Sequence, residues 1–129
     1  MSVKLEEAET RYVEAYGVRY AYRRLGTATG TPLILLQHFT GTMDSWDPAV
    51  VNALAADRPV IAFNNAGVGT SGGKTPDSVD QMTTDAESFI AALGFDKVDL
   101  LGFSLGGFIA QLMAVRPAVK VRKIILAGT

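Results

Sequence analysis

The sequence predicts a three-layer α/β/α sandwich built on a mostly parallel sheet of six strands, which opens with an antiparallel hairpin. Apolar runs of strand length alternate along the chain with stretches of helical periodicity, the pattern of a parallel sheet covered by helices. The first two β-rich runs are joined around one glycine, which indicates a hairpin. Helix-start signals and glycine or proline stops separate the later segments.

The first half of the chain contains a hairpin, two buried strands and a helix between them. The turn of the hairpin is centred on Gly17. Asp47 followed by Pro48 is a helix start, because a capping carboxylate precedes a proline at the first helical position. The predicted helix ends before Pro59. The expected elements are a hairpin of residues 11–16 and 18–23, a strand over 33–37, a helix over 48–57 and a strand over 60–63.

The second half of the chain predicts two helices and two strands in alternation. Ser78 and Gln81 form a capping-box pattern, and Gly94 and Pro117 are stop signals for the two helices. The first helix has one apolar face, made of Val79, Met82, Ala86, Phe89, Ile90 and Leu93. The expected elements are a helix over 79–93, a strand over 98–103, a helix over 108–115 and a last buried strand over 123–127.

Composition restricts the function classes. The chain has 129 residues, 48% of them hydrophobic, and a net charge of −1, which fits one soluble globular domain over residues 1–129. The charges are spread out, so no nucleic-acid partner is expected. The absence of cysteine excludes disulfides and Cys-ligated zinc, and we expect neither metal nor cofactor. The charged start is unlike a signal peptide, and no apolar run is long enough for a membrane span, so a cytoplasmic location is expected.

The most informative motif is G-x-S-x-G, residues 102–106, placed between an apolar strand and a helix. A strand that turns into a helix through one tight residue exposes the hydroxyl of that residue, and Gly102 and Gly106 make room for the strained turn. Ser104 is therefore a candidate nucleophile, and the N–H of Leu105 a candidate oxyanion donor. The alternative is a glycine-rich turn with an idle serine.

His38 is the only histidine, and none follows Ser104. It is thus the only imidazole available as a base, yet it stands at the end of a neighbouring strand, where a loop supplying the second oxyanion N–H is expected. The favoured interpretation is a histidine that supports its own loop by hydrogen bonds. Trp46, slightly further on, is expected to be a core or pocket-wall residue.

Two glycine patterns resemble nucleotide sites. Residues 67–72 spell G-x-G-x-x-G after a strand, but Pro76 and the Ser78 cap place the next helix start well past the loop. Residues 73–75 imitate the end of a phosphate loop, but Val68 occupies the position of the first required glycine. A nucleotide function is therefore not favoured.

Taken together, these motifs resemble the N-terminal half of an α/β-hydrolase, in the group of cofactor-free haloperoxidases, esterases and epoxide hydrolases. The resemblance covers nearly all of the chain. It implies that Ser104 is the nucleophile, that Leu105 is one oxyanion donor, and that the second donor falls on Thr40, with Phe39 as the alternative. His38 and Gly41 would support this loop.

The chain departs from the family pattern at three places. Phe39 follows His38 where the family has a His-Gly pair, and Asn64 and Ala66 stand at the family's acidic and arginine positions. The largest departure concerns the triad, because the family's acid and histidine come after further strands. The sequence therefore resembles a hydrolase truncated after the strand that follows the nucleophile helix.

The resemblance implies a truncated serine hydrolase, at most weakly esterolytic on a small ester-like ligand. The strand over 123–127 would become an apolar sheet edge, and such edges favour pairing with another chain. We therefore expect a homodimer through residues 123–127, or a complementary C-terminal half as partner. The alternatives are a non-catalytic fragment that self-assembles and one half of a split hydrolase completed in trans.

Overall fold

The computed structural model describes residues 5, 8–26, 29–38 and 41–128. Its elements in chain order are β1 (Arg11–Ala15), β2 (Val18–Leu25), β3 (Leu33–Leu36), the 3₁₀ turn η1 (Met43–Ser45), α1 (Pro48–Leu54), β4 (Val60–Phe63), α2 (Val79–Ala92), β5 (Lys97–Phe103), α3 (Leu105–Val115) and β6 (Lys120–Ala127).

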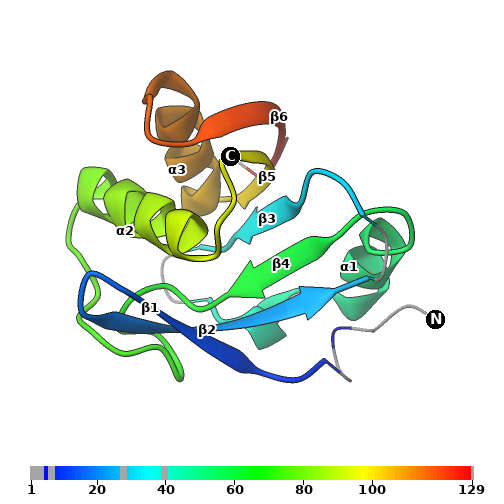
Figure 1. The fold of residues 1–129 in the computed structure, drawn as a ribbon, viewed down its shortest axis with the longest axis horizontal. Coiled ribbons are helices and arrows are strands. Elements are labelled where there is room, and N and C mark those ends of the chain that lie inside the picture. Colours follow the sequence, from blue (N-terminus) through cyan, green and yellow to red (C-terminus); the bar gives the residue numbers. More distant parts are fainter. Residues whose placement is uncertain (1–4, 6–7, 27–28, 39–40, 129) are drawn as a thin grey trace.

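These elements form the predicted α/β fold with an N-terminal hairpin (Figure 1). The six strands lie in the order β1-β2-β4-β3-β5-β6. The pairs β1–β2 and β2–β4 are antiparallel, whereas β3–β4, β3–β5 and β5–β6 are parallel. The carboxyl ends of the four parallel strands consequently share one edge of the sheet, where the loops after β3, β4 and β5 meet.

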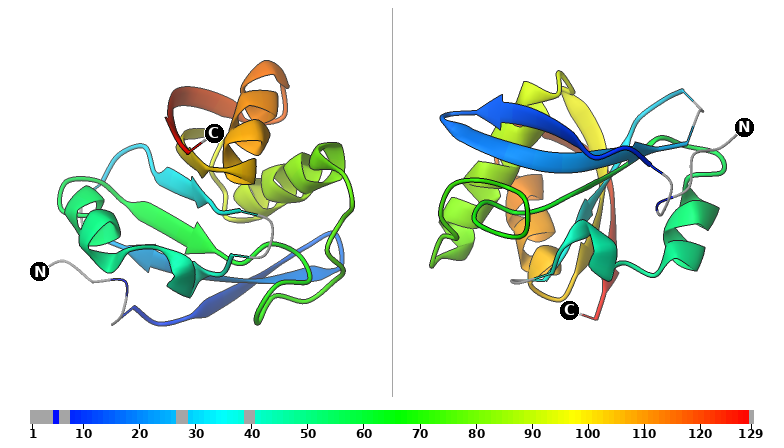
Figure 2. Two further views of the ribbon diagram at one scale, coloured as in Figure 1. Left: turned by 180° about the vertical axis from the view of Figure 1, so that it is seen from behind. Right: turned by 90° about the horizontal axis from the view of Figure 1, so that it is seen from below.

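Helices cover both faces of the sheet, which makes the three predicted layers (Figure 2). Successive residues of β3 point to opposite faces, as the pleat requires. Ile34 and Leu36 belong to the core beneath α2 and α3, and Leu33 and Leu35 to the core beneath α1. A short strand that is apolar at every position is thus explained by burial on both faces.

The predicted helix over 48–57 is too long at its end, because α1 stops at Leu54. Its predicted start is correct, since the Asp47 side chain accepts a hydrogen bond from the Ala49 N–H at 3.0 Å. The early end has a steric reason. A β-carbon added to Gly26 would lie 2.6 Å from the Ala55 carbonyl oxygen and 2.9 Å from that of Arg58, so the chain leaves the helix to run against β2.

Three other features differ from the prediction. The Ser78 side chain caps α2 by accepting from the Gln81 N–H at 3.2 Å, but the Gln81 side chain donates to Asp85 instead of returning to the cap. The helix α3 begins at Leu105, directly after the turn. The strand β6 begins at Lys120 and is mostly exposed, in contrast to the buried strand expected over 123–127.

In the part of the chain that the structure describes, no helix is long and apolar enough to cross a lipid bilayer.

Candidate active site

Ser104 lies at the junction of β5 and α3 with a strained backbone. Its φ is +55° and its ψ is −119°, in a region that residues with a side chain rarely adopt. The Ser104 N–H donates to the Ala127 carbonyl at 3.0 Å, and the Ser104 carbonyl accepts from the Gly107 N–H at 2.9 Å. Its side chain is half-buried and makes no capping hydrogen bond to the helix, so within the described residues the hydroxyl is available for other chemistry.

The two glycines that flank the turn are both required by close packing. A β-carbon on Gly102 would lie 2.5 Å from the Gly106 carbonyl oxygen and 2.6 Å from the Gly107 α-carbon. A β-carbon on Gly106 would lie 2.0 Å from the Leu36 carbonyl oxygen and 3.0 Å from that of Gln37. The first turn of α3 therefore lies directly against the end of β3, and the loop after β3 starts beside the turn that carries Ser104.

Leu105 is the first residue of α3. The N–H groups of the first helical turn have no acceptor inside their own helix, and the helix dipole adds a partial positive charge there. An anion formed on a group bound at Ser104 would meet this end of the helix. The geometry is compatible with an oxyanion donor at Leu105.

The loop that follows β3 is held at its start by Gln37. The buried Gln37 side chain accepts a hydrogen bond from the His38 N–H at 3.0 Å, and a β-carbon on Gly41 would collide with it. The Gly41 N–H donates to the His38 carbonyl at 3.1 Å. Phe39 and Thr40, the predicted positions of the second oxyanion donor, lie outside the described residues.

The hydrogen bonds of His38 in this loop come from its main chain. Within the described residues its imidazole makes no hydrogen bond; it lies edge-on to Phe103 with ring centroids 6.0 Å apart. A β-carbon added to Gly41 would lie 3.0 Å from the His38 Nε2, so the ring lies close to Gly41. The structure places the His38 ring beside Phe103, the residue before Ser104, and the support of the loop by His38 stays a prediction.

An apolar hollow of about 360 Å³ opens next to these groups, on the α1 face of the sheet. Trp46 forms part of its wall, as predicted, and lies edge-on to Phe103 at 6.4 Å between centroids. The buried indole Nε1 of Trp46 has no hydrogen-bond partner in the described part of the chain. Other residues that line the hollow are Leu35, His38, Val50, Leu54, Leu101 and Ala127.

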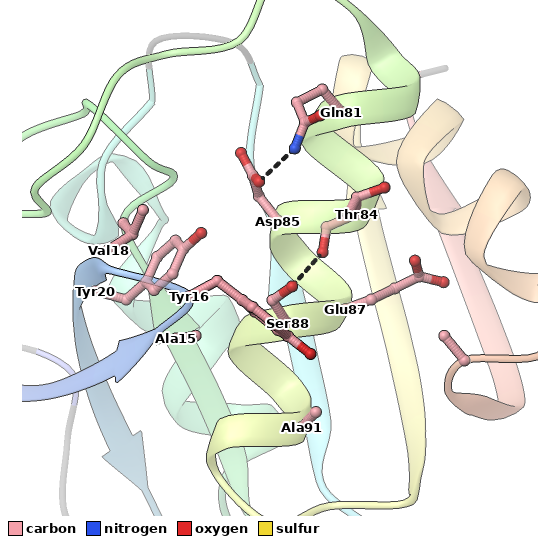
Figure 3. Close-up of a pocket in the computed structure, with 11 residues that line it drawn as sticks. Ala15, Tyr16, Val18, Tyr20, Gln81, Thr84, Asp85, Glu87, Ser88 and Ala91 are labelled. Atoms are coloured by element: carbon pink, nitrogen blue, oxygen red, sulfur yellow. Dashed lines mark hydrogen bonds between the residues drawn. The ribbon is translucent and has the colours of Figure 1, made fainter.

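A larger hollow, of about 640 Å³, lies between the β1–β2 hairpin and α2, away from Ser104 (Figure 3). Along α2, the Gln81 side chain donates to the Asp85 carboxylate, and the Ser88 hydroxyl donates to the Thr84 main-chain carbonyl. The Glu87 carboxylate points away from Tyr20 in Figure 3 and pairs with Arg116 at 3.2 Å. None of the elbow or loop residues lines this hollow, so the candidate chemistry does not belong to it.

Sequence reasoning missed two polar residues next to the site, Gln37 and Asn64. Both are almost fully buried, at 4% and 3% exposure. Each directly follows an apolar strand run, and a buried polar residue at the carboxyl end of a parallel strand is a signal that could have identified them. Among the described residues, no three His, Cys, Asp or Glu side chains gather in a group that could hold a metal ion.

The fold and the strand–turn–helix at Ser104 define the class of protein. The family model for the alpha/beta hydrolase fold matches residues 31–129, and the chain therefore belongs to the α/β-hydrolase fold family.

Solved structures agree with this assignment. The chain is 54% identical to an alpha/beta hydrolase fold protein from Chitinophaga pinensis, with a TM-score of 0.91 over 96% of this chain and 45% of that one. It is also similar to the esterase RhEst1 from Rhodococcus sp. ECU1013, at 29% identity and a TM-score of 0.75, over 91% of this chain and 44% of that one.

Among curated proteins, the chain is 37% identical over 101 residues to the human 1-acylglycerol-3-phosphate O-acyltransferase ABHD5, an alignment that covers 74% of this chain and 29% of that protein. The 129 residues thus correspond to less than half of the length of each of these relatives. The family is established by these matches, while the activity of the whole protein is a matter for proposal.

Proposed function

We propose that this chain carries the nucleophile part of a serine hydrolase that acts on small carboxylic esters. The observation that carries the proposal is the backbone of Ser104, held at positive φ between a buried strand and the N-terminus of α3, with a hydroxyl that does not cap the helix. Strain of this kind persists only where the surrounding packing enforces it, and it concentrates at functional positions. The esterase RhEst1 among the structural relatives favours ester chemistry.

In the proposed reaction the Ser104 oxygen attacks the ester carbonyl carbon and loses its proton to a base. The carbonyl electron pair moves onto the oxygen, and the Leu105 N–H and a second donor expected at Thr40 or Phe39 bind this oxyanion. When the carbonyl re-forms, the alcohol leaves with a proton, and an acyl-serine remains. Water then releases the acid. The acyl-serine also suits transfer to another hydroxyl, the activity in the name of ABHD5.

The proposed reaction needs a base that takes the proton of the Ser104 hydroxyl. A serine without a histidine partner stays a neutral alcohol and a poor nucleophile. His38 is the only histidine in the sequence. In the family the acid and histidine follow later in the chain, so we expect the triad to be completed by polypeptide that corresponds to the unmatched part of the relatives. An oxyanion hole and binding alone still leave about 10³–10⁴ of rate enhancement over water.

Mixing the chain with p-nitrophenyl acetate tests the proposal. We expect a burst of p-nitrophenol approaching one equivalent per chain, because acylation of an activated ester needs less assistance than deacylation. Ser104→Ala should abolish the burst. His38→Gln serves as the matched control, and it should keep the burst if His38 is not the base. An equal release of p-nitrophenol by the wild type and Ser104→Ala would refute the nucleophile.

A second candidate is an assembly role through β6, favoured by the exposed apolar side chains of this strand. Ile125 and Leu126 are 44% and 46% exposed, and the strand pairs with β5 on one side. In this case two copies would join their β6 strands into one continuous sheet, or β6 would receive a complementary polypeptide with the remaining part of the fold. Either arrangement is compatible with the hydrolase proposal.

A further inference from the structure

The glycine-rich turn after β4 surrounds one buried side chain, that of Asn64. The Asn64 Oδ1 accepts a hydrogen bond from the Met43 N–H at 2.8 Å, and its Nδ2 donates to the Thr70 Oγ1 at 3.3 Å. The main-chain donor at Met43 determines which end of the amide faces it, because an N–H requires an oxygen acceptor. Asn64 is 3% exposed, so these bonds are made without competition from water.

The main chain of Asn64 is fixed as firmly as its side chain. Its N–H donates to the Ala21 carbonyl at 3.0 Å, and its carbonyl accepts from the Ser71 hydroxyl at 2.8 Å. The same Ser71 oxygen accepts from the Ala21 N–H at 2.8 Å. The main chain of Asn64 is therefore bonded to the centre of β2. The hydrogen bond from Met43 to the Asn64 side chain consequently fixes Met43 relative to the sheet.

The glycines of the turn have a steric role in this arrangement. Gly69 has a φ of +55°, and a β-carbon there would lie 2.8 Å from the Asn64 Nδ2. Gly67 has a φ of +75°, and a β-carbon there would lie 2.3 Å from the Thr75 amide nitrogen. Two of the three glycines of the G-x-G-x-x-G pattern are thus explained by close packing, Gly69 against Asn64 and Gly67 against Thr75, without a phosphate ligand.

Met43 is the point at which the chain returns from the loop after β3. It is the first residue of η1, which is capped by Thr42. The loop is consequently held from both ends, by Gln37 at its start and by Asn64 at its end. Its start also touches the first turn of α3 through Gly106, beside Ser104. A displacement of Met43 would therefore also displace the end of the loop after β3.

We propose that Asn64 is a positioning residue for ester hydrolysis, which fixes the main chain of Met43, where the chain returns from the loop expected to carry the second oxyanion donor. The proposal rests on the proposed function, because it assigns Asn64 to the same site. Asn64 contacts neither the ester nor Ser104 in this role. It acts through the main chain of Met43. The turn of residues 64–72 keeps the Asn64 side chain in place.

The test compares Asn64→Ala, which removes the acceptor, with Asn64→Asp, which keeps an oxygen facing Met43. With p-nitrophenyl acetate we expect Asn64→Ala to slow the burst rate constant about tenfold with an unchanged amplitude, and Asn64→Asp to restore it to within about threefold of the wild type. A purely structural role would lower the amplitude through loss of folded protein. Equal burst rate constants in wild type and Asn64→Ala would overturn the proposal.

Hydrogen exchange provides a readout that does not depend on activity. The Met43 amide should exchange at least tenfold faster in Asn64→Ala than in the wild type or Asn64→Asp, while amides of β5 keep their protection. Unchanged exchange at Met43 would also overturn the proposal. A failure of the proposed function looks different, because the burst would then be absent or independent of Ser104 in every variant.

Should Asn64→Ala not fold, the same hydrogen bond can be removed from the donor side. Met43→Pro deletes the N–H at the first position of η1, where proline is tolerated, and the extended backbone of Thr42 (φ −103°, ψ 176°) suits a residue that precedes proline. Met43→Ala is the matched control, because it loses the side chain and keeps the N–H. We expect a burst about tenfold slower in Met43→Pro than in Met43→Ala, and equal rates would contradict the proposal.

Discussion

At the scale of single residues, the site depends on positions where no side chain fits. Gly106 illustrates this, since a β-carbon would lie 2.0 Å from the carbonyl oxygen of Leu36. That oxygen belongs to the buried end of β3 and cannot move without distorting the sheet. The glycine therefore allows α3 to start at the sheet surface, and this close approach brings Ser104 and the loop after β3 together.

We predict that Gly106→Ala destabilises the fold by about 1–3 kcal/mol, the usual cost of overpacking, despite the higher helix propensity of alanine. Gly72→Ala is the matched control, because its φ is not in the left-handed region and the nearest atom to its β-carbon is 3.7 Å away. We expect that control to stay within about 0.5 kcal/mol of wild type. Urea denaturation measures both, and an equal effect of the two substitutions would contradict this steric account.

At the scale of elements, α2 is attached to the sheet by an aromatic cluster. Phe89 of α2 stacks on Phe63 of β4 with ring centroids 4.2 Å apart, and Tyr20 of β2 lies 5.6 Å from Phe89. Burial of the Tyr20 phenol, with a smaller effect from the nearby Asp85, raises its pKa well above the ordinary value of 10.0. The interface between β2 and α2 thus requires a neutral phenol.

This interface should therefore weaken in alkali. The folded-state pKa of Tyr20 is raised, so its contribution is fully present below the unfolded pKa near 10 and is lost as the pH rises toward the folded value. For each proton that the folded and unfolded states bind differently, the free energy of unfolding changes by about 1.4 kcal/mol per pH unit. We predict that the free energy of unfolding falls between pH 10 and 11, and that Tyr20→Phe removes part of this fall. Identical pH profiles for Tyr20→Phe and wild type would disprove the assignment.

At the scale of the whole molecule, α3 and β6 carry several of the exposed large apolar side chains. Phe108 and Val115 of α3 are 56% and 80% exposed, and Ile125 of β6 is 44% exposed. Full burial of one such side chain contributes roughly 1.5–3 kcal/mol, and a whole domain is stable by only about 5–15 kcal/mol. Covering β6 would therefore change the stability of the molecule substantially.

We predict that the 129-residue chain forms dimers at micromolar concentration through β6. Light scattering should give twice the mass of the chain. Ile125→Lys should return the monomer, because a charged residue on an edge strand opposes pairing. Val115→Lys, an equally drastic change at an exposed apolar position of α3, should leave the dimer intact. A monomeric wild type with cooperative unfolding would rule out self-association.

Much of this fold could be predicted because its local signals agree with its tertiary environment. The apolar face of α2 and the Asp47 cap of α1 follow from spacing that is visible in the chain. The end of α1 could not be predicted, because it is decided by the approach of residues 55–58 to Gly26, almost thirty positions earlier. The missing half of the Ser78 capping box has a local origin, since the Gln81 side chain donates to Asp85 one helical turn further along α2.

The sequence by itself determined the element order, the family resemblance and the serine at the turn, because each is a short-range pattern of apolar periodicity, capping and glycine placement. Only the tertiary structure decided what Asn64 and Gln37 do, and why the glycines near them are needed. The hydrogen bond from Met43 to Asn64 joins residues that are distant in sequence, and the Gln37 carbonyl lies against the still more distant Gly106. Contacts of this kind arise when the sheet brings the carboxyl ends of its strands together, and no local pattern encodes them.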